Sequence, residues 1–176
     1  MGVARIRTTP KSSTTIKPID MAKVEIDAID QKILSHLTGN ARMPFLEIAR
    51  ECGVSGAAIH QRFNKLVSQG VIHGTQLMVD PKTLGYDVCA IVEVQTRDID
   101  NYMHIVEALQ AIPEVVSCHF ITGKSNLLLK LYCRDHEHFM NTLMEKVRKI
   151  DGVTSTETYI SLYEAFSRQV QIEESR

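Results

Sequence analysis

The chain has 176 residues, of which 44% are hydrophobic and 23% are charged, and its net charge is −1. This balance is typical of a globular protein and excludes a fibrous, collagen-like or largely disordered chain. No apolar run reaches the roughly 18 residues of a membrane span, and the N-terminus lacks the apolar stretch of a signal peptide. We therefore expect a cytoplasmic protein with no membrane partner. The cysteines are widely spaced without a C-x-x-C pair, which predicts packed thiols and no metal site.

The near-zero net charge conceals an asymmetry between the two halves of the chain. Residues 1–80 contain ten Lys and Arg against seven Asp and Glu, whereas residues 81–176 contain ten against fourteen. The halves therefore carry +3 and −4. A basic N-terminal half is compatible with nucleic-acid binding, but an excess of this size does not establish it.

Apolar residues recur at helical spacing in the first part of the chain. Residues 1–22 are rich in Thr, Ser, Lys and Pro without such spacing, and we expect a flexible tail there. Three helices are then predicted, beginning near Ile26, at Pro44 in the first turn, and after a capping Ser55. Gly53 and Gly70 end the second and third. The tight turn at Gly53 predicts a helix-turn-helix domain over residues 25–70.

The third helix carries no acidic residue from Ser55 to Gly70, which suits a surface that meets phosphates. Small residues at its start allow close approach to a duplex, and Gln61 and Asn64 can pair with adenine edges. Arg62 and Lys65 suit phosphate contacts. The predicted DNA-binding residues are Ser55, Gly56, His60, Gln61, Arg62, Asn64 and Lys65. A three-helix bundle that binds nothing remains the alternative interpretation of this segment.

The second half of the chain contains an internal repeat. The segment starting at Val92 aligns with the segment starting at Leu129 at an offset of 37 residues, which becomes 38 after a one-residue insertion in the second copy. Each copy is predicted to be a strand, a helix and a strand, with Gly123 in the turn between the copies. Two such units give a ferredoxin-like βαββαβ domain, so the predicted fold class is α+β.

In that architecture both helices cover one face of the sheet. The strands are apolar, as in Val88–Val92 and Leu127–Leu129, so we expect an apolar open face that a second subunit buries. A two-fold dimer would also place two helix-turn-helix units on one particle, as palindromic DNA sites require.

The chain resembles the Lrp/AsnC family, the leucine-responsive, feast/famine type of transcription regulators. The resemblance rests on IDAIDQKILSHLTGNAR from Ile26, FLEIARECGVS from Phe45, RFNKLVSQGVI from Arg62, DPKTLGY from Asp80 and PEVVSCHFITGKSNLLLKL from Pro113. It implies a winged or plain helix-turn-helix, a hinge strand or linker at residues 71–85, with the strand near residues 71–79, and an effector-sensing and oligomerisation domain at residues 86–165. A C-terminal tail at residues 166–176 would follow. The resemblance further implies a regulator that binds double-stranded DNA and assembles from homodimers to an octamer.

In the family an amino-acid effector binds between dimers, near the turn that here comprises Thr122, Gly123, Lys124, Ser125 and Asn126. Backbone groups at Gly123 would bind its carboxylate and the last side chain its ammonium group. The family commonly has Asp at the position of Asn126, and an amide is the weaker ammonium partner. Either the ligand differs, another acid supplies the charge, or the turn is a hairpin without a ligand. If the ammonium group lies at this position, Asn126→Asp should tighten binding.

Two other functions stay open from the sequence. Sirohaem decarboxylases resemble these regulators in both domains, and the chain has seven histidines, but these are scattered and no nucleophile-base motif appears. His136 and His138 diverge at a helix start and are not expected to share a metal ion. The second alternative is a sensing or assembly module without DNA contact. We predict a DNA-binding regulator, not an enzyme, without a cofactor or metal.

Overall fold

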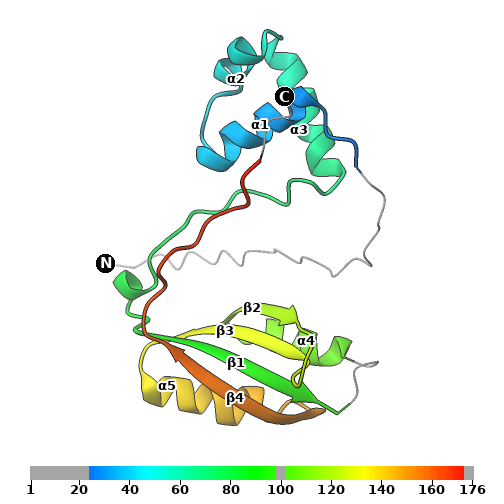
Figure 1. The fold of residues 1–176 in the computed structure, drawn as a ribbon. Helices are drawn as coiled ribbons and strands as arrows, with labels where there is room; N and C mark the ends of the chain where they lie inside the picture. The colour runs from blue at the N-terminus through cyan, green and yellow to red at the C-terminus, as the bar shows by residue number, and fades with distance from the viewer. Residues whose placement is uncertain (1–23, 98–101, 173–176) are drawn as a thin grey trace, which may run out of the picture. The chain divides into compact units, whose positions relative to one another are not determined.

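A computed structural model describes residues 24–97 and 102–172. The predicted tail at residues 1–22 lies outside these residues. The chain divides into two compact units, one containing the residues up to Thr75 together with those from Gln169, and the other comprising Gln76–Arg168. Figure 1 shows the helical first unit and the sheet of the second. None of the helices in the described ranges is long and apolar enough to cross a membrane.

The first unit contains the predicted helices, α1 (Ala28–Gly39), α2 (Phe45–Cys52) and α3 (Gly56–Ser68). Pro44 is the N-cap residue of α2 and lies just outside the helix, because the capping residue keeps an extended backbone. The helices pack around a small buried core of Ile33, Ile48, Ala49, Ile59 and Leu66. This core takes residues from all three helices.

The tight turn between α2 and α3 depends on local chemistry. Gly53 adopts the left-handed conformation with a φ of 66°, and its N–H bonds back to the end of α2. Two residues later the Ser55 side chain accepts a hydrogen bond from Ala58 N at 3.2 Å and caps α3. A glycine stop followed at once by a serine cap leaves only a short connection between the helices.

The second unit is a four-stranded antiparallel sheet in the order β2-β3-β1-β4. Its elements are η1 (Lys82–Leu84), β1 (Val88–Thr96), α4 (Met103–Gln110), β2 (Val115–Phe120), β3 (Leu127–Cys133), α5 (His136–Asn141), η2 (Thr142–Val147) and β4 (Val153–Ser161). Side chains from α4, α5 and η2 share one buried cluster with alternate residues of β1 and β3, so these helices cover the same face. The predicted ferredoxin-like fold is confirmed.

The inserted residue of the second repeat has a structural counterpart. Thr142–Val147 form a π-helix that directly continues α5. A π-turn accommodates one extra residue within a helix, so the insertion widens one turn and leaves the flanking residues on their buried face. Leu143 and Val147 are accordingly both buried.

Two expectations from the sequence are not met in the single chain. Residues 71–80, all of them described, form no strand, because no strand of the described residues lies alongside to pair with them. The open face of the sheet is also less apolar than expected. Most valines and leucines of β1 and β3 point to the helices, whereas the open face combines apolar and polar side chains. It carries Cys89, Ile91, Glu93, Leu128, Lys130, Tyr132, Glu157 and Tyr159.

Candidate functional sites

The α3 helix presents most of its predicted DNA-binding side chains to solvent. Ser55, His60, Gln61, Asn64 and Lys65 are exposed, and Gly56 is half-buried. A Cβ atom at Gly56 would meet only a Leu46 methyl group at 3.9 Å. The helix thus begins with a surface that a flat or grooved partner can approach closely.

Two of these polar side chains already interact with each other. Asn64 Nδ2 lies 3.1 Å from His60 Nδ1, and the His60 ring packs edge-on against Phe45 at 5.7 Å between ring centres. Phe45 also contacts Phe63 at 5.1 Å. These contacts hold His60 and Asn64 in one orientation, while Gln61 and Lys65 have no partner among the described residues.

Arg62 has a different environment from its neighbours on α3. Its guanidinium donates to Asp27 at 2.5 Å and to Asp30 at 2.9 Å, and Asp30 is 1% exposed. Hydrogen bonding to Asp27 and then to Asp30 raises the pKa of Arg62. The pKa of Asp27 is lowered, first by the backbone N–H of Asp30, with burial opposing and Arg62 contributing further. Arg62 therefore connects α3 to the start of α1. A phosphate contact, as predicted from the sequence, would instead require its guanidinium to face solvent.

The predicted effector residues form the turn between β2 and β3, beside the end of β1. Ile121 N donates to Asn126 O at 3.0 Å, and Asn126 N donates to Val94 O at 3.1 Å. Gly123 is exposed with a φ of 123°, and a Cβ atom there would touch nothing within 4 Å. The backbone at Gly123 is thus exposed to solvent, and its role in binding an effector stays a prediction.

Side chains of the turn bond to β1. Ser125 is buried, and its hydroxyl donates to Glu93 Oε2 at 2.9 Å. Asn126 Oδ1 accepts hydrogen bonds from Thr96 N at 2.9 Å and Thr96 Oγ1 at 3.2 Å. Gln95 Nε2 donates to Lys124 O at 3.1 Å. These bonds fix the conformation of the turn and bring the Glu93 carboxylate next to it.

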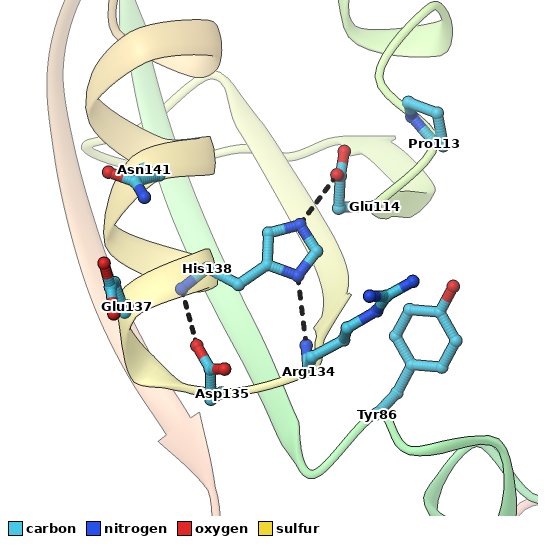
Figure 2. A pocket seen from close by; sticks show the side chains of 8 residues that line it. All are labelled: Tyr86, Pro113, Glu114, Arg134, Asp135, Glu137, His138 and Asn141. Atoms are coloured by element: carbon cyan, nitrogen blue, oxygen red, sulfur yellow. Dashed lines mark hydrogen bonds and ion pairs between the residues drawn. The ribbon is translucent and has the colours of Figure 1, made fainter.

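A pocket of about 560 Å³ lies at the junction of β3 and α5. Figure 2 shows His138 among the residues that line it, bonded to Glu114 and to the backbone of Arg134. Lys146 also donates to Glu114, at 2.8 Å. Burial raises the pKa of the Glu114 carboxyl, but hydrogen bonds from Lys146 and His138 outweigh it and hold that pKa at about 2. Across the described ranges, no group of three His, Cys, Asp or Glu residues is placed to hold a metal ion.

Comparisons with known proteins identify both units. Residues 26–67 match the AsnC-type helix-turn-helix domain, and residues 88–171 match the Lrp/AsnC ligand binding domain. The chain belongs to the Lrp/AsnC family. It is a DNA-binding transcription regulator, as the exposed face of α3 predicted.

Relatives of this Lrp/AsnC chain cover most of its length. The regulatory protein AsnC of Haemophilus influenzae is 36% identical over 83% of this chain and 97% of its own length. The structure of Escherichia coli AsnC, at 34% identity, covers 84% of this chain and 99% of that chain with a TM-score of 0.77. A feast or famine regulatory protein (Rv3291c) from M. tuberculosis complexed with L-methionine is 25% identical over 85% of this chain and 100% of its own, with a TM-score of 0.77.

Sequence reasoning did not find three residues that complete these sites in the Lrp/AsnC fold. Glu93 and Thr96 lie on β1 and bond to the turn about 30 residues away, and Glu114 bonds across 24 residues to His138. Glu93 carried one detectable signal, because it is an acidic residue within the otherwise apolar run of β1. Glu114 follows a proline in a loop, and nothing in the sequence pattern marked it as a site residue.

Proposed function

We propose that α3 reads the operator with His60, Gln61 and Asn64 on base edges and Lys65 on phosphate, and that Ser55 and Gly56 permit the close approach. The observation that carries this proposal is the exposed face of α3, which is free of acidic residues from Ser55 to Gly70. Carboxylates on such a face would be repelled by the duplex, whereas amides and imidazole can pair with base edges. Arg62 contributes by positioning α3 against Asp27 and Asp30.

The chain acts as a homodimer that assembles to an octamer. Apolar side chains remain on the open sheet face and on the segment after β4, where Leu162, Tyr163 and Phe166 are each at least 76% exposed. Burying such surface against a second copy gives the free energy of association. Sedimentation of the full chain at micromolar concentration tests this assembly, and a monomer would contradict it.

The effector is an amino acid or a related small molecule bound between dimers at residues 122–126. Support comes from the ligand-binding description of the matching family domain and from the methionine complex of a relative. Within this chain the support is the open backbone at Gly123 and the carboxylate beside it.

The test of the DNA-binding role begins with selection of DNA fragments by the full-length protein. Binding of the selected fragment and of a scrambled one is then measured by fluorescence anisotropy from about 50 to 200 mM salt. We expect tighter binding to the selected fragment at every salt concentration, and a loss of affinity with salt on both. Equal affinity for the two fragments would contradict sequence-specific recognition.

A further inference from the structure

The hydrogen bonds of the turn at residues 122–126 fix which atom of the Asn126 amide faces Thr96. A backbone N–H can only donate, so the Asn126 atom that faces Thr96 N must be the amide oxygen. The Thr96 hydroxyl bonds to the same oxygen. The Nδ2 group therefore occupies the other branch of the side chain, and it has no partner among the described residues. At this position the turn offers a hydrogen-bond donor.

A donor at this position has the wrong polarity for an ammonium group, which also only donates. It suits an oxygen of the ligand, either a carboxylate or a carbonyl. The exposed Lys124 on the same turn adds a positive charge that favours a carboxylate. The ammonium group of an amino acid must then find its partner on another residue.

Glu93 is the carboxylate that the fold brings to this turn. It lies on the open face of β1, since its neighbours Val92 and Val94 point into the core. The buried Ser125 hydroxyl bonds to Oε2 and holds the side chain in place, while Oε1 has no partner in the described part of the chain. Asn126 N donates to Val94 O, so the turn is anchored to β1 at the residue next to Glu93.

Glu93 faces a second carboxylate across the sheet. Its direct neighbour on β4 is Glu157, which accepts a hydrogen bond from Tyr159 at 2.8 Å. That bond raises the pKa of the Tyr159 hydroxyl, and the Glu93 charge contributes to the same shift. Within the described ranges, neither carboxylate forms an ion pair with a Lys, Arg or His. Like charges directly opposite each other destabilise a sheet, so a cationic ligand group would relieve this pair.

We infer that Glu93 binds the ammonium group of the effector and that Asn126 donates to an oxygen of the same ligand. This inference rests on the proposed binding of an amino acid at residues 122–126. It reverses one expectation from the sequence, because Asn126→Asp would place a carboxylate against the ligand oxygen and weaken binding.

The experiment uses the full-length protein and begins with a thermal-shift screen of the twenty standard amino acids. Calorimetry then measures the affinity of the best of them, and of its N-acetyl derivative, for the parent and three variants. Glu93→Gln removes the charge proposed to bind the ammonium group. Glu157→Gln is the matched control, since it removes an equal charge from the neighbouring strand. Asn126→Asp tests the polarity of the turn.

We expect Glu93→Gln to lower the affinity for the amino acid by about ten- to hundredfold, because a hydrogen bond between charged groups is lost. The affinity of the same variant for the N-acetyl derivative should be nearly that of the parent, since that ligand has no ammonium group. Glu157→Gln should change the affinity by less than about threefold, because a charge that is not bonded to the ligand is screened by solvent. Without ligand, the melting temperature of each variant should equal or exceed that of the parent. This measurement separates a binding role from a structural one.

Three outcomes would overturn the inference. Parent-like affinity of Glu93→Gln would show that another group binds the ammonium, and tighter binding by Asn126→Asp would place the ammonium at residue 126. If no amino acid stabilises the parent, the inference fails together with the effector part of the proposed function. The anisotropy assay with selected DNA would still measure the DNA-binding part separately.

Discussion

Arg62→Ala should destabilise the helical unit, although Arg62 lies on the helix proposed to contact DNA. Its guanidinium bonds at 2.9 Å to Asp30, which is 1% exposed, and at 2.5 Å to Asp27, which is 52% exposed. Losing a charged hydrogen bond to a buried carboxylate costs about 1.5–3 kcal/mol. The exposed pair with Asp27 adds no more than about 1 kcal/mol. The expected loss in the free energy of unfolding is therefore about 2–4 kcal/mol.

A loss of this size is large for a small unit. Domains of this length rarely have more than about 3–5 kcal/mol of stability, so the loss should remove most of it and lower the melting temperature of the helical unit markedly. Helix content followed by circular dichroism during heating measures this directly. Arg62→Lys should be intermediate, because one ammonium group cannot hold both carboxylates in the geometry of a guanidinium.

Lys65→Ala is the matched control on the same helix, since the Lys65 side chain is exposed and has no partner among the described residues. It should melt with the parent but reduce the slope of log affinity against log salt by about one unit. If Arg62→Ala instead melts with the parent and reduces the slope in the same way, then Arg62 contacts phosphate and the positioning role is wrong.

Three further predictions follow from individual contacts. Because the folded pKa of Glu114 is about 2, below its ordinary 4.5, stability should be constant at neutral pH and fall as the pH drops from 4.5 towards 2. Glu114→Gln should flatten that part of an acid-unfolding curve, and an unchanged slope would contradict the assignment. Gln61→Ala should lose about 1–3 kcal/mol of discrimination between bases at one position of the operator and leave the slope of log affinity against log salt unchanged. Anisotropy on single-base variants of the selected DNA measures both. Gly53→Val should lower stability by about 1–2 kcal/mol, because φ is 66° and a Cβ atom there meets no other atom within 4 Å, so strain alone acts. Gly39→Ala, which has neither a positive φ nor a close neighbour, is its control in thermal melts.

Local features of the sequence were enough to predict the elements and their order. Helical spacing, the Gly53 stop and the Ser55 cap act within a few residues, so they can be identified without knowing the rest of the fold. The internal repeat predicted two strand-helix-strand units and therefore the antiparallel sheet. Even the single inserted residue of the second copy was visible, although its accommodation as a π-helix was not.

The faces of the strands were harder to predict. The run Val88–Val92 offers apolar residues to both faces, so the sequence predicted an open face more apolar than the one observed. Burial alternates strictly along β1 and β3 only because the helices cover one side. The single chain does not form the hinge strand predicted at residues 71–79, since a strand exists only where a neighbour can exchange hydrogen bonds with it.

Only the tertiary structure decided which polar groups face each other. Arg62 and Lys65 look equivalent in the sequence, yet one is bonded across 32 residues to a buried carboxylate and the other faces solvent. The partner of Ser125 is likewise 32 residues away, and the orientation of the Asn126 amide depends on a backbone N–H 30 residues earlier. Periodicity and capping determine where a helix or strand forms, because those forces are local. Hydrogen bonds between side chains depend on how separate elements pack, and that packing determines which charges remain available to DNA and to an effector.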